Sequence, residues 1–319
     1  MVDARQPLAL AGSSRRCSES TTRLDSTYHD RLAEVLPTGL NVGAHVVDID
    51  TGRSVGVHST RPVVAASTYK VLILLALARA AAAGYVDWTT SVTVPARGRT
   101  FGATGLSSMR DESRLSVRDL ALLMIQVSDN AATDILQRLV PVTGLQDMLN
   151  ELGLRDTVID LDCAGLIEAL TRDLGRAPAD VHTLPGEELA RLASQSPVLQ
   201  ARAGNRTTSA DMTRLLAAIW LDRAGPPAAC AEVRRILALQ FAPYRFSTVY
   251  DASVRVSSKT GTTYGLIRNE VGVFEFPDGS RFAAAVFLRL DPPRLVDLTA
   301  DAAVGVAAKT AIDLLRDTR

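Results

Sequence analysis

The stretch Ser67-Thr68-Tyr69-Lys70, continued by the apolar run 71–83, is the feature around which the rest of the chain can be interpreted. A serine three residues before a lysine, at the start of a helix, places both side chains on one face. The run that follows is long and apolar enough to form a buried helix. A neutral Lys70 amine beside Ser67 would take the hydroxyl proton and activate the serine. The pattern therefore predicts a serine that forms covalent intermediates.

Two further motifs follow in the chain, Ser128-Asp129-Asn130 and Lys259-Thr260-Gly261. Together with Ser67-Thr68-Tyr69-Lys70, they resemble the S-x-x-K, S-D-N and K-T-G set of class A β-lactamases and penicillin-binding proteins. The resemblance extends over roughly residues 23–319 and implies a β-lactamase/transpeptidase-like fold.

Hydrophobic patterns place strands at both ends of the chain and helices between them. A β-hairpin is expected at 42–58, and later strands at 253–259, 266–276 and 281–290. The predicted fold class is α+β, with an antiparallel sheet of about five strands from both chain ends, flanked by helices, and an all-helical lobe. The expected helices cover residues 24–36, 71–83, 116–127, 143–152, 166–174, 187–193, 208–221, 228–239 and 298–315.

The expected domain organisation is a tail followed by one catalytic domain. Residues 1–22 are polar and rich in Ser and Arg, which is typical of a flexible tail. Within 23–319, the α/β lobe takes about 23–66 and 240–319, and the helical lobe takes about 67–239. The three motifs can converge in a cleft between these lobes.

Charge and composition favour a small-molecule or peptide substrate over a polyanion. The 35 basic and 35 acidic residues cancel, so no overall field attracts nucleic acid or an anionic membrane. The oligomeric state stays open. Residues 1–20 lack an apolar segment long enough for a signal peptide, so we expect a cytoplasmic protein unless a leader has been removed.

The spacing of the cysteines and histidines indicates neither a metal site nor a disulfide framework. Cys17, Cys163 and Cys230 lie far apart, and the histidines lack the spacing of metal ligands. No metal or organic cofactor is therefore expected.

The resemblance implies acyl transfer through a serine ester. Ser67 would attack an amide or ester carbonyl while Lys70 accepts its proton. Burial and the nearby charge of Lys259 would lower the pKa of Lys70. Ser128 would carry a proton between Lys259 and the leaving nitrogen.

Substrate-binding roles also follow from the resemblance. Asn130 would orient Lys70 and hold a substrate amide, and Thr260 and Gly261 would lie along the substrate. The backbone N–H groups of Ser67 and Thr262 would form an oxyanion hole.

Two residues have competing interpretations. Arg268 matches an arginine that class A enzymes place on the strand after K-T-G, where with Lys259 it would bind a substrate carboxylate. Alternatively, Arg268 is a strand arginine paired with Glu270 or Asp278. Phe101 either forms a lip of the cleft or is an ordinary exposed loop aromatic.

The chain departs from class A β-lactamases between residues 154 and 205. Those enzymes carry an E-x-x-L-N loop there, whose glutamate activates the water that clears the acyl-enzyme, and this chain lacks that motif. Glu168, Glu187 and Glu188 lie in this segment, on what are expected to be solvated helix faces. Lys70 is therefore the predicted general base, and fast hydrolysis is in doubt.

Three functions remain open. The leading hypothesis is a serine hydrolase of the β-lactamase type, acting on a β-lactam or a similar carboxylate-bearing amide or ester. The second is a cytoplasmic biosynthetic acyltransferase or esterase that uses the same serine. The third is a penicillin-binding or sensing protein that becomes acylated and then deacylates slowly.

Overall fold

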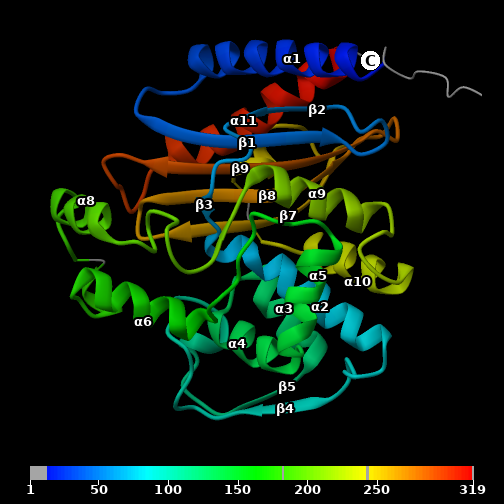
Figure 1. Cartoon of the computed structure of the whole chain (residues 1–319). Helices are drawn as coiled ribbons and strands as arrows, with labels where there is room; N and C mark the ends of the chain where they lie inside the picture. Colours follow the sequence, from blue (N-terminus) through cyan, green and yellow to red (C-terminus); the bar gives the residue numbers. More distant parts are fainter. Residues whose placement is uncertain (1–12, 182, 242–243, 318–319) are drawn as a thin grey trace, which may run out of the picture.

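The computed structural model describes residues 13–181, 183–241 and 244–317. Its centre is a five-stranded antiparallel sheet with the order β2-β1-β9-β8-β7 (Figure 1). Strand β1, near the start of the chain, pairs antiparallel with β9, near its end, along the full length of β1. The two ends of the chain therefore share one sheet, as predicted. The strands are β1 (Leu40–Asp48), β2 (Ser54–Val57), β7 (Arg255–Thr263), β8 (Ile267–Glu275) and β9 (Arg281–Leu290).

Strand β9 is buried on both faces because helices cover both sides of the sheet. Ala283 and Phe287 belong to the core shared with the helical lobe, whereas Phe282 packs in the core beneath the terminal helices. Figure 1 shows those helices, α1 (Ser13–Val35) and α11 (Leu298–Asp317), on the same side of the sheet. The continuous apolar run of β9 follows from this central position.

The helical lobe is built around α2 (Lys70–Ala82), which is buried on nearly every side. A helix that is apolar all round belongs inside a core. At the start of α3 (Val117–Gln126), the Ser116 hydroxyl accepts a hydrogen bond from the Asp119 N–H at 3.1 Å and caps the helix. The helices that accompany α2 are α3 (Val117–Gln126), α4 (Asn130–Leu139), α5 (Val142–Glu151), α9 (Ser209–Trp220) and α10 (Pro227–Leu237).

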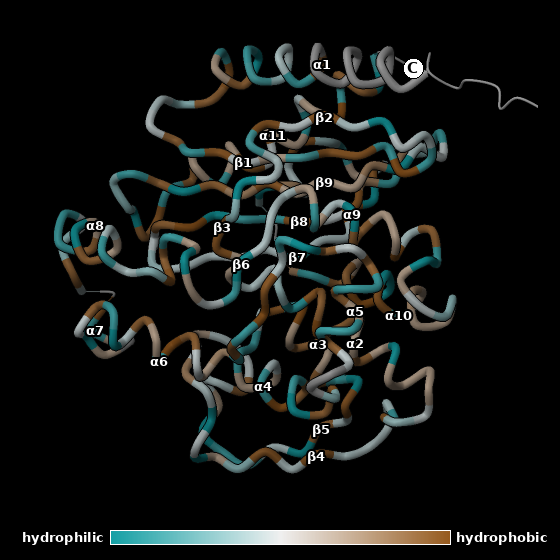
Figure 2. The backbone as a smooth tube through the Cα atoms, viewed as in Figure 1, coloured by the Kyte–Doolittle hydropathy of each residue, from teal (hydrophilic) through white to brown (hydrophobic). Residues whose placement is uncertain are grey.

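A third apolar cluster lies beside the junction of the two lobes. It joins α6 (Cys163–Leu174) and α8 (Gly186–Gln195) to Leu266 and Ile267 at the start of β8. The short helix α7 (Pro178–Val181) lies between α6 and α8 in the chain. Figure 2 shows hydrophobic residues along the central strands and helices and hydrophilic residues in many of the outer loops. Within the described residues, no helix is both long and apolar enough to cross a membrane.

The structure differs from the predictions at the amino terminus and in two short strand pairs. Helix α1 begins at Ser13, so residues 13–22 continue the helix instead of forming a loose tail, and residues 1–12 lie outside the described part. The unpredicted pairs contain strands of only two or four residues, which is too short for an alternating pattern to stand out. These pairs are β3 (Val63–Val64) with β6 (Arg206–Thr207) and β4 (Ser91–Val94) with β5 (Ser113–Ser116).

Candidate active site

Ser67 lies on a single 3₁₀ turn, η1 (Ala66–Tyr69), that leads directly into α2. The preceding residue, Ala66, has a φ of 45°, a left-handed conformation that costs energy for a side chain other than glycine. The Asn269 amide on β8 holds the segment before the turn by donating to the Val64 carbonyl at 2.8 Å. The sheet thus fixes the nucleophile at a strained turn. Within the described part of the chain, no side chain hydrogen-bonds the Ser67 hydroxyl, which lines an open cleft.

Lys70 is fully buried, one helical turn after Ser67. Its ammonium group donates to the Ser128 carbonyl at 2.7 Å, the Asn130 Oδ1 at 2.9 Å and the Ser128 Oγ at 3.2 Å. Burial lowers the pKa of Lys70, although the carboxylates of Asp129 and Asp134 oppose the shift. A neutral amine could keep the first two hydrogen bonds and turn its lone pair to a hydroxyl. This arrangement brings Lys70, Ser128 and Asn130 together, as the motifs suggested.

Asp129, between Ser128 and Asn130, organises the loop around the cleft. Its carboxylate caps α4 through the Ala132 N–H at 3.1 Å and accepts from the Leu106 N–H at 2.6 Å. Asn130 in turn donates from Nδ2 to the Phe101 carbonyl at 2.9 Å. The second motif therefore fixes the 101–106 loop as well as Lys70. Phe101 is 45% exposed and lines the cleft, which is the position expected of a lip.

The third motif lies on β7, at the edge of the sheet, packed against the turn that carries Ser67. A Cβ atom at Gly261 would come within 3.2 Å of the Ala66 Cβ and 3.3 Å of the Ala65 carbonyl oxygen. Glycine is thus the residue that lets the strand approach the nucleophile so closely. Lys259 is fully buried two residues earlier, where burial first and the charge of Lys70 second hold its pKa well below the ordinary value. The predicted lowering of the Lys70 pKa by Lys259 is not seen at Lys70, where burial is the cause, and the effect of one lysine on the other appears at Lys259 instead.

Gln240, shortly after α10, hydrogen-bonds the free edge of β7. The three sequence motifs gave no indication of this residue. Its Oε1 accepts from the Thr260 N–H at 2.5 Å and from the Lys259 ammonium at 3.5 Å. Because the Thr260 N–H points away from β8, the Thr262 N–H, two residues later, faces the same outer edge. Thr262 lines the cleft with Ser67, so this orientation suits the proposed oxyanion hole.

Two buried charged residues lie behind β7 and were also missed. Arg245, in the 3₁₀ turn η3 (Arg245–Thr248), donates to the Thr262 Oγ1 at 2.8 Å. Glu270 on β8 accepts from the Ser258 hydroxyl at 2.6 Å, and Ser258 accepts from the Gln240 amide at 2.8 Å. Burial raises the pKa of Glu270 to about 7. These contacts join segments that are distant in the sequence, so no local pattern marks them.

Arg268 does not reach the cleft. Its guanidinium is 2% exposed, lies 3.3 Å from the Asp301 carboxylate and donates to the Arg294 and Leu295 carbonyls at 2.9 Å. The loop before α11 covers it, so the structure does not place Arg268 where an open carboxylate pocket requires it. The alternative partners are also wrong, because Glu270 bonds Ser258 and Asp278 pairs with Arg316.

The cleft that opens on Ser67 has a volume of about 440 Å³. Its other side is the start of α6, where Cys163 approaches the Asn130 Oδ1 at 3.5 Å and the Tyr69 hydroxyl at 3.0 Å. Burial raises the pKa of the Cys163 thiol to about 11, so it is neutral at pH 7. Asp134 positions this residue by accepting from the Cys163 N–H at 2.7 Å.

The stretch 163–167 at the start of α6 reads Cys-Ala-Gly-Leu-Ile and lies in the segment where class A β-lactamases carry their E-x-x-L-N loop. Cys163 and Ile167 line the cleft with Ser67, and neither is a carboxylate or an amide.

The glutamates of this region are turned away from Ser67, as predicted. Glu168 pairs with Arg172 on the exposed face of α6, and Glu188 pairs with Arg176. Glu187 is exposed at the start of α8. Among the described residues, no carboxylate lines the cleft. The described residues also contain no cluster of His, Cys, Asp or Glu suited to hold a metal ion.

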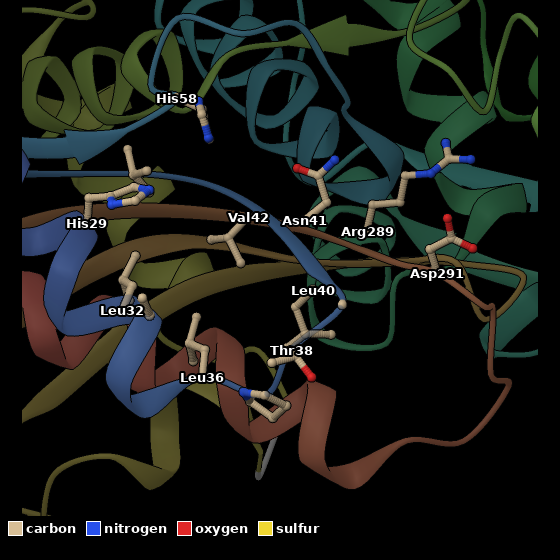
Figure 3. A pocket seen from close by; sticks show the side chains of 14 residues that line it. His29, Leu32, Leu36, Thr38, Leu40, Asn41, Val42, His58, Arg289 and Asp291 are labelled. Atoms are coloured by element: carbon tan, nitrogen blue, oxygen red, sulfur yellow. The ribbon is translucent and has the colours of Figure 1, made fainter.

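A larger hollow, of about 630 Å³, lies elsewhere, between α1 and the start of β1 (Figure 3). Figure 3 shows His29 on α1, His58 after β2, and Arg289 and Asp291 near the end of β9 around it. None of the motif residues lines this hollow, and it lacks a nucleophile paired with a base. The smaller cleft is therefore the candidate active site.

A sequence model of the β-lactamase enzyme family matches residues 28–315. The chain belongs to this family. The β-lactamase regulatory protein BlaB of Streptomyces cacaoi is 30% identical over 310 residues, which cover 90% of this chain and 96% of the relative.

Solved structures of the family share the fold. A β-lactamase from Sphaerobacter thermophilus is 27% identical with a TM-score of 0.71, and the match covers 90% of this chain and 96% of that one. PBP-A is 20% identical with a TM-score of 0.72, covering 93% of this chain and 97% of that one. A point mutant of PBP-A has been solved as an acyl-enzyme complex with penicillin G and matches equally well. The predicted β-lactamase/transpeptidase-like fold is thus confirmed.

Proposed function

We propose that this protein forms a covalent acyl-enzyme on Ser67 with a β-lactam or a similar amide or ester, and that the adduct is long-lived. The observation that carries the proposal is the contrast between the two sides of the cleft. Ser67 lines the cleft and is followed one helical turn later by Lys70, which lies 3.2 Å from the Ser128 hydroxyl, whereas the start of α6 presents Cys163 and Ile167, and no carboxylate lines the cleft among the described residues.

Acylation would use Ser67 together with Lys70, one helical turn later, and Ser128, whose hydroxyl lies 3.2 Å from the Lys70 ammonium. The Ser67 Oγ bonds to the carbonyl carbon as its proton passes to the Lys70 amine. The C–N or C–O bond of the substrate then breaks, and the leaving atom takes a proton delivered through the Ser128 hydroxyl, 3.2 Å from Lys70. The Ser67 and Thr262 N–H groups would stabilise the developing oxyanion.

Deacylation by water would be slow, since a general base contributes about 10²–10⁴-fold to such a step. Neither the neutral Cys163 thiol nor the Ile167 side chain can take a proton from water at pH 7. A slowly released adduct suits a sensing role, and the relative named a β-lactamase regulatory protein is consistent with that role.

Burst kinetics with a chromogenic cephalosporin test the proposal. We expect about one equivalent of colour per protein molecule, followed by a steady rate at least about a hundredfold slower than the burst. Continuous turnover without a burst would instead support an efficient β-lactamase. Absence of any colour change would contradict acylation of this substrate.

A further inference from the structure

A smaller cavity, of about 200 Å³, adjoins the cleft that opens on Ser67. Its walls come from residues 61–64, which lead to the Ser67 turn, from the segment after α8, and from strands β1, β8 and β9. Val64 and Leu199 also line the cleft, so the two spaces share a wall. Ser67 itself lines the cleft and not this cavity, which is therefore distinct from the candidate active site.

The strand register places two arginine side chains on one face of the sheet. Asn41 on β1 pairs with Arg289 on β9, and Figure 3 shows the two side chains next to each other. Gly43, two residues after Asn41, presents the same face of β1. A Cβ atom at Gly43 would lie 3.7 Å from Nη2 of Arg61, so the Arg61 guanidinium group rests against this glycine. Arg61 and Arg289 therefore enter the cavity over the same two strands.

The lining of the cavity carries an unbalanced positive charge. Arg61 and Arg289 are its charged side chains, and no carboxylate lines it among the described residues. In that part of the chain, neither guanidinium group forms an ion pair, and Asp291 lines the neighbouring hollow instead. Two like charges that share a cavity repel each other, so an anion between them would stabilise the arrangement.

Most N–H donors of the two guanidinium groups are available to a ligand. The Arg289 guanidinium donates to the Leu199 carbonyl. The Arg61 side chain is half-buried and has no hydrogen-bond acceptor within the described ranges of the chain. Burial lowers the pKa of Arg61, and no neighbouring carboxylate opposes this shift. Because arginine stays charged at pH 7 and carries several donors, both side chains suit a ligand with oxygen acceptors.

The walls of the cavity are held by buried hydrogen bonds. The Asn269 amide donates to the Val64 carbonyl at 2.8 Å, which ties the segment that carries Arg61 to β8. On the other side, the Leu199 N–H donates to the Ser196 hydroxyl at 3.2 Å. The two arginines are thus presented by backbone that the fold already fixes.

We propose that this cavity binds a small dianion with oxygen acceptors, a phosphate group or a dicarboxylate, between Arg61 and Arg289. Guanidinium groups bind carboxylate and phosphate oxygens through paired, charge-assisted hydrogen bonds. The exposed Asn41 amide would add a neutral donor at the mouth of the cavity. The inference goes beyond the proposed function and does not depend on it, because the anion would bind whether or not Ser67 reacts.

Isothermal titration calorimetry of the full chain, in a low-salt buffer without phosphate, tests the site. The probes are inorganic phosphate, succinate and succinamide, which matches succinate in length but is uncharged. We expect at least one of the two anions to bind one-to-one with a Kd below about 5 mM, and succinamide to bind at least about tenfold more weakly. Binding of phosphate alone or of succinate alone would identify the kind of oxygen group that the site prefers. Failure of both anions to bind in that range, or equal binding of succinamide, would overturn the inference.

Charge-removing variants assign the binding to the two arginines. Arg61→Gln and Arg289→Gln should each weaken anion binding by at least about tenfold, because each loses charge-assisted hydrogen bonds. Arg61→Gln should fold as the wild type does, since the Arg61 side chain has no hydrogen-bond partner in the described protein, and the urea midpoint checks this. Arg223→Gln is the matched control, because it removes the same charge at an exposed position outside the cavity, and it should bind the anion as the wild type does. Unchanged affinity in Arg61→Gln, or an equal loss in Arg223→Gln, would overturn the inference.

Discussion

Lys70 shows how one buried side chain can serve both as an anchor and as a base. Its three acceptors tie the second motif to α2, while burial lowers its pKa toward the range in which the amine is neutral. In the proposed mechanism, Lys70 would therefore couple the local fold to the reactivity of Ser67.

Replacing Lys70 by alanine should slow the acylation of Ser67 by penicillin by roughly 10²–10⁴-fold, because the general base is lost. The rate can be followed by intact-protein mass spectrometry in quenched samples. Lys309→Ala is a suitable control, since Lys309 lies on α11 in an ion pair with Asp313, outside the cleft lining. Acylation of Lys70→Ala at the wild-type rate would contradict the assignment.

Glu270 makes stability depend on pH. The unfolded chain ionises this carboxyl near pH 4.5, whereas burial keeps it protonated in the folded protein up to about pH 7. Its contribution to stability is therefore full below pH 4.5 and is lost as the pH rises through 7.

Between these pH values, the unfolding free energy of the wild type should fall by up to about 3 kcal/mol relative to that of Glu270→Gln. Urea unfolding of both proteins at a series of pH values from 4.5 to 8 measures the difference. Parallel pH profiles for the two proteins would show that Glu270 has an ordinary pKa.

At the scale of elements, the proposed function makes the start of α6 the segment that would set the lifetime of an acyl-enzyme. This helix places Cys163 opposite Ser67, and Asp134 on α4 holds it there through backbone hydrogen bonds. The same backbone could present a carboxylate at that position.

The Cys163→Glu variant should therefore deacylate faster than the wild type. We expect at least a tenfold shorter lifetime of the penicillin adduct, which is part of the effect of a general base. A larger effect is expected when Cys163→Glu is combined with Ile167→Asn, because the introduced amide would supply a second polar group to bind the hydrolytic water. The adduct is followed by mass spectrometry after free penicillin is removed, with Cys163→Ser as the control without a base. A Cys163→Glu adduct as persistent as that of Cys163→Ser would argue against this account of α6.

For the whole molecule, the antiparallel sheet of about five strands from both chain ends and the buried helix after Ser67 could be predicted because they depend on strong local signals. Ser67 and Lys70 are one helical turn apart, and the apolar run behind them permits little besides a buried helix. The long strands at the two ends of the chain had clear hydrophobic patterns, and few arrangements of strand pairs were compatible with those patterns. These signals were enough to locate the cleft.

The remaining features depend on contacts between distant segments. Whether Arg268 opens to the cleft or is covered depends on where the 294–295 loop lies, which no pattern around Arg268 reveals. Gln240 and Arg245 reach β7 from the segment after α10, and nothing in their neighbours marks them as part of a site. Cys163 was not predicted as a site residue because a lone cysteine carries no pattern, and its contacts with Tyr69 and Asn130 join distant segments.

The central claim is that Ser67, which lines the cleft, forms a covalent adduct with the help of Lys70, Ser128 and Lys259. The most direct measurement is the intact mass of the protein after incubation with penicillin, followed by peptide mapping. The account predicts a wild-type mass increase equal to one penicillin, located on the peptide that contains Ser67, and no increase in Ser67→Ala. An unmodified wild type with intact penicillin in solution, or an adduct that persists in Ser67→Ala, would contradict it.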